Sequence, residues 1–173
     1  AFERMRKASA NEGNISGIPS GFTELDKITS GWQKSDLVII AARPAMGKTA
    51  FVLSMAKNIA VDFNIPVAIF SLEMSNVQLI NRLIMNVCEI EGNKIRNGRL
   101  TTAEWDRLEN RINVLQKAPI FVDDTPGLSV FELQSKARKL VKDKGIKLII
   151  IDYLQLMNAN GSSFGSREQE VSI

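Results

Sequence analysis

The stretch from Asp36 to Thr49 constrains the fold more than any other part of the chain. It opens with an apolar run, Leu37 to Ala41, which predicts a buried parallel strand. A short loop then ends in Gly47-Lys48-Thr49, and an apolar helical pattern follows at once. This strand–loop–helix order is the setting of a phosphate-binding P-loop, where backbone N–H groups and the positive end of the helix attract phosphates.

The residue types in this loop predict separate roles. Lys48 would reach the β- and γ-phosphates of a nucleotide, and the Thr49 hydroxyl would ligate Mg²⁺. The strict motif has glycine six residues before the lysine, where this chain has Ala42, so a chance Gly-Lys-Thr helix start remains the alternative. The predicted nucleotide-binding residues of the loop are Ala42, Arg43, Pro44, Ala45, Met46, Gly47, Lys48, Thr49 and Ala50.

The rest of the chain alternates strand and helix patterns. Ser or Thr followed three residues later by Glu or Gln predicts that helices begin after Ser75, Thr101 and Ser129. Two further helices are expected, a short one near Thr23 and a longer one after Thr49. Further strands are predicted at Val67 to Phe70, Pro119 to Val122 and Lys147 to Ile151. The order β-α-β-α-α-β-α-β predicts an α/β fold, a mostly parallel sheet flanked by helices.

Composition narrows the classes of function. The 173 residues are 45% hydrophobic and 24% charged, as in soluble globular proteins, and no apolar run approaches the ~20 residues of a membrane span. No signal-peptide pattern opens the chain, so we expect a cytoplasmic protein without a membrane partner. The absence of histidine excludes a zinc site and a histidine base, and the single Cys88 is expected to be a small buried thiol. Four basic residues are expected to form a solvated face rather than a DNA track: Lys94, Arg96, Arg99 and Arg107.

A second set of site residues is predicted at the ends of strands. The apolar run Leu148 to Ile151 ends in Asp152, which would hold Mg²⁺ through its water shell. Many P-loop ATPases place a glutamate directly after that aspartate, but this chain has Tyr153. Glu73 follows the strand that ends near Phe70 and would lie at the same sheet edge. Its position alone leaves two readings open, a base for the attacking water or a solvated carboxylate at a helix start.

One motif would indicate a different class of protein, the GTPases. Asp124-Thr125-Pro126-Gly127 matches the Asp-x-x-Gly that senses the γ-phosphate in GTPases. The guanine-binding Asn-Lys-x-Asp is missing, and Asp152 is the better Mg²⁺ candidate. We therefore interpret Asp124 as part of a turn before the Ser129 cap.

Four motifs in this order resemble the bacterial replicative DNA helicases of the DnaB family: Ile18 to Asp26, Ala41 to Thr49, Phe70 to Ser75 and Ile150 to Met157. The resemblance implies a RecA-like P-loop NTPase domain that hydrolyses ATP with Mg²⁺. It also implies a homo-hexameric ring that translocates on single-stranded DNA and unwinds duplex during DNA replication. Primase and a helicase loader are the implied partners.

The resemblance also assigns roles to residues. It gives Lys48 and Thr49 to phosphate and Mg²⁺, Glu73 to the attacking water, and Asp152 to Mg²⁺. Arg43 and Gln155 match family positions near the nucleotide without a firm role, and the family tolerates alanine at position 42.

The resemblance divides the chain in two. Residues 1–14 would be the end of a linker helix and a joint, and residues 15–173 a RecA-like domain that is incomplete at its C-terminal side. In such domains the strand after Asp152 carries the γ-phosphate sensor and lies between the Asp152 strand and the P-loop strand. We therefore expect a gap, or an abnormal pairing, between those two strands. We also expect negligible ATPase activity from the 173 residues alone.

Two alternatives remain open at this point. One is a RecA/RadA-like recombination ATPase, against which Asp152 to Met157 and Arg43 to Met46 speak. The other is a nucleotide-binding scaffold without turnover. ATPase activity stimulated by single-stranded DNA would separate the helicase from the scaffold.

Overall fold

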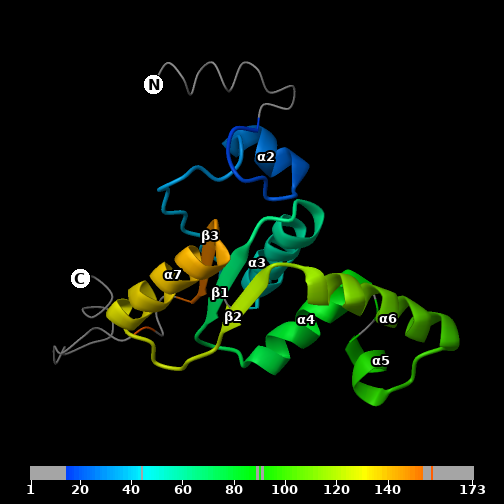
Figure 1. Ribbon diagram of the computed structural model, residues 1–173. Coiled ribbons are helices and arrows are strands. Elements are labelled where there is room, and N and C mark those ends of the chain that lie inside the picture. Colours follow the sequence, from blue (N-terminus) through cyan, green and yellow to red (C-terminus); the bar gives the residue numbers. More distant parts are fainter. Residues whose placement is uncertain (1–14, 44, 89, 91, 154–156, 158–173) are drawn as a thin grey trace.

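The computed structural model describes residues 15–43, 45–88, 90, 92–153 and 157 (Figure 1). Its strands are β1 (Val67–Ser71), β2 (Ile120–Asp123) and β3 (Leu148–Asp152). Its helices are α2 (Thr23–Thr29), α3 (Lys48–Lys57), the π-helical turn η1 (Asn58–Asp62), α4 (Asn76–Cys88), α5 (Gly92–Asn97), α6 (Thr102–Lys117) and α7 (Val130–Lys144). The expected strands after the P-loop are confirmed within one or two residues at each end, whereas α5 was not expected.

The strands form one parallel sheet in the order β2-β1-β3. Val67 lies opposite Ile120 on one side and Leu148 on the other, and Ser71 lies opposite Asp152. All three carboxyl ends therefore meet at one edge of the sheet, where ligands of open α/β sheets bind.

The sheet is covered on both faces, which explains why its strands are continuously apolar. Alternate residues of a strand point to opposite faces. Val67 and Ile69 pack with α3 and α4, while Ala68 and Phe70 pack with α7. Figure 1 shows the same layering, with α7 on one side of β1 and α3 on the other.

The predicted capping boxes are present where the described helices begin. Thr101 accepts a hydrogen bond from the Glu104 N–H (3.3 Å), and the Glu104 carboxylate accepts one from the Thr101 N–H (2.9 Å). Ser129 and Glu132 repeat this exchange at 3.2 and 3.0 Å. At Ser75 the exchange with Gln78 is looser, at 3.5 and 3.1 Å. Side chains that satisfy orphan N–H groups explain why the sequence located these helix starts well.

The motif from Ile18 to Asp26 folds as a turn held by a buried carboxylate. Asp26 is 4% exposed and accepts hydrogen bonds from the backbone N–H of Ser20 (2.7 Å) and of Gly21 (3.2 Å). Gly21 has a φ of +81°, and a Cβ there would lie 2.4 Å from that of Asn58. Phe22 stacks on Phe51 of α3 with ring centroids 5.0 Å apart. The turn thus anchors the N-terminal segment on the helix that begins at the P-loop.

The strand expected at Leu37 to Ala41 is not formed, and that prediction is wrong. The segment has no strand pairing among the described residues and is drawn as a coil in Figure 1. Leu37 is 88% exposed and Ile39 79% exposed. A cavity of about 550 Å³ separates this segment from β3, lined by residues 34–42 on one side and 146–153 on the other. An extended segment needs a hydrogen-bonded neighbour to become a strand. The cavity lies between residues 34–42 and β3, where the sequence predicted a gap or an abnormal pairing.

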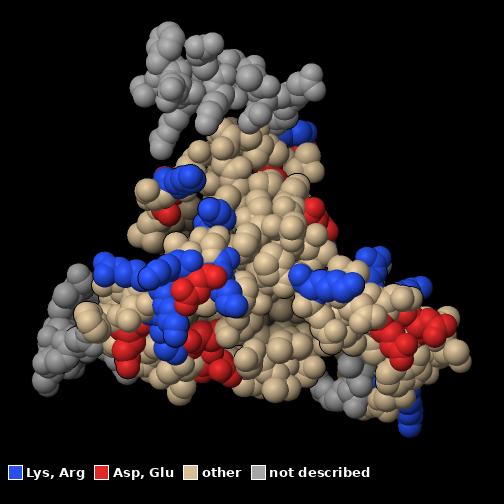
Figure 2. Space-filling model, viewed as in Figure 1, with Lys and Arg blue, Asp and Glu red and all other residues tan. Residues whose placement is uncertain are grey.

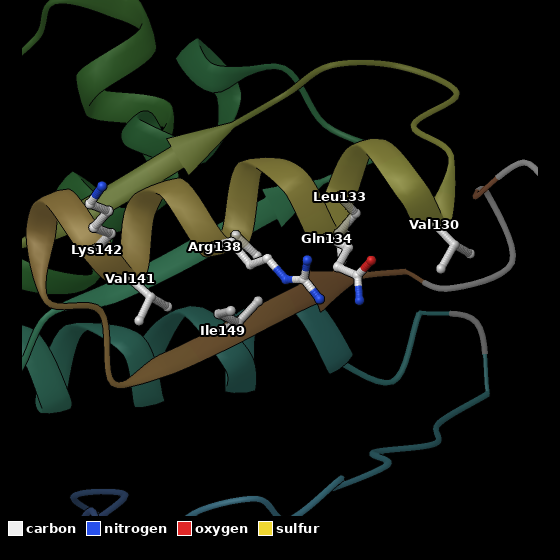
Figure 3. Close-up of a pocket in the computed structure, with 8 residues that line it drawn as sticks. Val130, Leu133, Gln134, Arg138, Val141, Lys142 and Ile149 are labelled. Atoms are coloured by element: carbon white, nitrogen blue, oxygen red, sulfur yellow. The ribbon is translucent and has the colours of Figure 1, made fainter.

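The outer surface of α7 is strongly basic. Figure 2 shows Lys and Arg gathered over this helix, which carries Lys136, Arg138, Lys139, Lys142 and Lys144. Beside it a groove of about 590 Å³ runs between α7 and β3, with Arg138 and Val141 of α7 on the side that faces Ile149 (Figure 3). No helix in the described part of the chain is long and apolar enough to span a membrane.

Candidate nucleotide site

The phosphate loop enters α3 through a left-handed turn. Ala45 and Gly47 have φ values of 63° and 85°, and the Met46 N–H donates to the Arg43 carbonyl (3.2 Å). A Cβ at Gly47 would meet nothing within 4 Å, so it is the backbone conformation that favours glycine there. Ala42 is not among the residues with positive φ. Alanine at the position where the strict motif has glycine therefore costs no backbone strain.

Three predicted site residues meet where α3 begins and β3 ends. The Thr49 hydroxyl donates to Asp152 Oδ2 at 2.8 Å. The Lys48 Nζ lies 3.3 Å from Asp152 Oδ1, and the side chains are 27% and 8% exposed. The same Nζ lies 4.0 Å from the centre of the Tyr153 ring. A hydroxyl, a carboxylate and a cation thus converge at a helix N-terminus, a donor set that suits a phosphate with a hard divalent cation.

Glu73 lies at the same edge, on the turn between β1 and α4. It is exposed, and no hydrogen bond or ion pair of its side chain is found among the described residues. The turn itself is held firmly. The buried Ser71 hydroxyl donates to the Met74 carbonyl (2.7 Å) and accepts from the Met74 N–H (3.2 Å), and the Leu72 N–H donates to the Asp152 carbonyl (2.8 Å). A fixed backbone with a free carboxylate fits a group that must face a ligand.

Asp124 has a structural contact that agrees with the turn interpretation. Its carboxylate accepts a hydrogen bond from the Asn76 N–H at the start of α4 (2.8 Å). The preceding Asp123 accepts from the Thr125 N–H (3.0 Å) and from Lys136 (2.6 Å). Burial alone would raise the pKa of Asp123, but the hydrogen bonds from Lys136 and Thr125 outweigh it and lower that pKa. Among the described residues, no hydrogen bond or ion pair joins either aspartate to Lys48 or Thr49.

The remaining predicted residues divide into two groups. Arg43 and Met46 are exposed on the loop, as are Ala42 and Ala45, and Ala50 is exposed in the first turn of α3. Pro44 and Gln155 lie outside the described residues. Among the described residues, no three His, Cys, Asp or Glu side chains cluster as a metal site. The two residues predicted as cation ligands, Thr49 and Asp152, have their side-chain oxygens 2.8 Å apart.

Two residues near the site were not assigned roles from the sequence. The contact of Tyr153 with Lys48 could not be foreseen, because the direction of a side chain just past a strand end does not follow from strand periodicity. The hydrogen bonds of Ser71 with Met74 were missed because a buried serine in an apolar run has no distinctive pattern.

Cys88, by contrast, is buried in a small cluster with Ile90 and Leu108, as expected. Burial raises the pKa of the Cys88 thiol, against the opposing effect of Arg111 and Arg107.

Comparisons with known proteins agree with this geometry. Residues 17–173 match the family described as DnaB-like helicase C-terminal domain. The chain is 46% identical over 171 residues to the replicative DNA helicase DnaB of Geobacillus stearothermophilus, covering 99% of this chain and 38% of that protein. The chain thus spans well under half of the length of this relative.

Two solved structures share the fold. A solved ATPase domain superposes with a TM-score of 0.89 at 38% identity, covering 99% of this chain and 61% of that one. A DnaB-like replicative helicase, described with its interactions with primase, superposes with a TM-score of 0.87 at 38% identity, covering 99% and 41%. The sheet order, the loop and the match over most of its length agree: the chain belongs to the DnaB-like helicase C-terminal domain family and has the RecA-like fold of its ATPase domains.

Proposed function

We propose that the chain is part of the ATP-driven motor of a replicative DNA helicase. The observation that carries this is the convergence of Lys48, Thr49 and Asp152 at the carboxyl edge of a parallel sheet. ATP and Mg²⁺, when bound, would supply the phosphoanhydride bond and the charge neutralisation that its cleavage requires. The residues present fit that pair, since they offer a cation, a hydroxyl and one carboxylate at a helix N-terminus.

In this proposal each side chain has one task. Lys48 neutralises charge that develops on the transferring phosphoryl group, and Thr49 and Asp152 hold the cation. Glu73 accepts a proton from the attacking water, a role that its exposed carboxylate on a fixed turn supports. The residues from Ala42 to Ala50, on the loop and the first turn of α3, would surround the phosphates, and Gln155 would belong with the nucleotide-binding residues.

The proposed substrate and partners rest on family membership. We propose that the complete subunit forms a homo-hexamer around single-stranded DNA and couples hydrolysis to translocation and unwinding. The DnaB-like structure described with primase supports primase as a partner, and a helicase loader is proposed on the same family grounds. Residues 1–14 are proposed as the end of a linker, and residues 15–173 as part of the motor domain. The start of the family match at residue 17 supports that boundary.

The test is ATP turnover by the complete subunit with and without single-stranded DNA. Lys48→Ala should abolish turnover, because it removes the cation nearest the transferring charge. Glu73→Gln should keep nucleotide affinity within a few fold while turnover drops at least ~10²-fold, as for the loss of a positioned base. Glu109→Gln, an exposed carboxylate on α6, is the matched control and should leave turnover unchanged.

Each outcome separates the candidates. Wild-type turnover in Lys48→Ala would refute the P-loop assignment. Equal loss of binding and turnover in Glu73→Gln would make Glu73 structural. A wild-type subunit that binds nucleotide without turning it over would indicate a scaffold.

A further inference from the structure

We propose that Tyr153 is a positioning residue that competes with nucleotide phosphate for the ammonium group of Lys48 and thereby sets the nucleotide affinity of the site. The inference rests on the proposed function, since it takes the loop before α3 as a nucleotide site. It goes further in giving a role to an aromatic residue that the P-loop motif does not include.

The geometry shows two partners sharing one cation. The Lys48 Nζ lies 4.0 Å from the centre of the Tyr153 ring, well within the ~6 Å over which a ring face attracts a cation. The distance from Nζ to Asp152 Oδ1 is 3.3 Å, longer than the ~2.7–2.9 Å of a close charge-assisted hydrogen bond. The ammonium group is therefore within reach of both the ring and the carboxylate, and its contact with the carboxylate is not a close hydrogen bond.

The surroundings strengthen the ring contact. The Lys48 side chain is 27% exposed and that of Asp152 is 8% exposed, so water screens this group only in part. Asp152 also accepts a hydrogen bond from Thr49 on its other oxygen (2.8 Å), which fixes the carboxylate. A cation–π contact gains in strength as the cation loses water.

The choice of a ring has a consequence for binding. A carboxylate at position 153 would hold Lys48 by charge, but it would add a second negative group beside Asp152 and repel a polyphosphate. An aromatic face holds the cation without that added charge. A phosphate bound by the loop must draw the ammonium group off the ring, and the lost ring contact is subtracted from the binding free energy.

The first experiment compares nucleotide dissociation constants of the complete subunit, measured by titration of a fluorescent ADP analogue. Tyr153→Leu should tighten binding about fivefold, equivalent to about 1 kcal/mol at 1.4 kcal/mol per factor of ten. Tyr153→Phe keeps the ring and should bind within twofold of wild type. Trp105→Leu, which removes an exposed aromatic side chain on α6, is the matched control and should also bind as wild type.

Unchanged or weaker binding by Tyr153→Leu would overturn the proposal, and so would a Phe variant that behaves like the Leu variant. Thermal unfolding of each variant shows whether the Leu change also affects folding, because a purely structural role would lower the midpoint without tightening binding. If Tyr153→Leu does not fold, the next measurement decides, since it uses the unsubstituted ring.

Tyr153, the only tyrosine of the 173 residues, can be probed directly once its signal is distinguished from that of any tyrosine elsewhere in the complete subunit. After 3-fluorotyrosine labelling of the complete subunit, its ¹⁹F resonance is the one absent from the Tyr153→Phe spectrum. Saturating ADP should move this resonance in the same direction as Lys48→Met does without nucleotide, because both remove the cation from the ring. A resonance that nucleotide leaves unmoved would refute the competition.

The two proposals fail in distinguishable ways. If Lys48→Ala leaves nucleotide affinity unchanged, the nucleotide site itself is wrong. If Lys48→Ala weakens binding but Tyr153→Leu does not tighten it, only the competition by Tyr153 is wrong.

Discussion

Replacing Asp26 by alanine tests whether the turn before α2 is held by its buried carboxylate. Ser20 is fully buried, and its N–H donates to Asp26 at 2.7 Å, while the partly buried Gly21 N–H donates at 3.2 Å. A buried donor left without an acceptor costs about 1–3 kcal/mol, and the Gly21 N–H, which can reach water, costs less. The better helix propensity of alanine returns about 0.5 kcal/mol within α2. The net expected loss is about 1–3 kcal/mol of unfolding free energy.

Two further variants give this prediction a scale. Asp26→Asn keeps one oxygen for the Ser20 N–H but turns its NH2 group, a donor, toward the Gly21 N–H, so about 1–2 kcal/mol should be lost. Glu24→Ala on the same helix removes only an exposed ion pair with Lys27, whose side chains are 83% and 65% exposed. That control should change stability by at most ~0.5 kcal/mol.

The assay is equilibrium unfolding in urea, followed by circular dichroism and by tryptophan fluorescence. Trp32 is a suitable reporter because it forms the bridge with Ile18 next to this turn. The expected order of stability is Glu24→Ala, then Asp26→Asn, then Asp26→Ala. An Asp26→Ala variant within 0.5 kcal/mol of wild type would refute the reasoning from the two backbone hydrogen bonds.

Two other predictions concern single contacts. Asp124→Asn should change neither turnover nor stability by much, because an oxygen remains for the Asn76 N–H. Asp124→Ala should lose about 1 kcal/mol of unfolding free energy in urea, as for other lost helix caps. A large loss of turnover in the Asn variant would revive the GTPase-like interpretation. Hydrogen bonds from Lys94 and from the Thr101 N–H lower the pKa of Glu104 from 4.5 to about 2. Because the folded-state pKa is depressed, this contribution to stability is complete above the unfolded pKa and is lost as pH falls from about 4.5 toward 2. Lys94→Met should therefore flatten the fall in urea midpoint over that range, and equal slopes for variant and wild type would contradict the assignment.

Much of the fold was predictable because its signals are local. A cap residue and its partner three positions on decide where a helix begins, so the sequence located α6 and α7 from Thr101 and Ser129. The strand β1 is buried on both faces, and a continuous apolar run is what such a strand requires. Gly145 ends α7 in a left-handed conformation, as its position after the last helical turn predicts.

The part that failed depends on non-local pairing. Leu37 to Ala41 has the same apolar character as β1, yet it forms no strand, because a strand exists only where a neighbour offers backbone hydrogen bonds. The apolar composition of a segment indicates that it suits burial, but it does not indicate which other segment will pair with it. The short helix α5 was missed for a related reason, since Gly92–Asn97 has a glycine at its start and too few apolar residues for a helical period.

The candidate nucleotide site is formed even though residues 37–41, which precede the phosphate loop, lie outside the sheet. The contacts of Asp152 explain how. Its carboxylate receives the Thr49 hydroxyl at the start of α3, and its backbone carbonyl receives the Leu72 N–H on the turn that carries Glu73. The register that pairs Ser71 with Asp152 therefore fixes the distance between the phosphate loop and the candidate base along the sheet edge. A change that shifted this register would move Glu73 relative to Lys48, whereas a change in residues 37–41 would not. Single substitutions at Leu37 or Ile39 should accordingly leave the Lys48, Thr49 and Asp152 cluster intact, because the hydrogen bonds and ion pair found for it among the described residues join β3, β1 and α3.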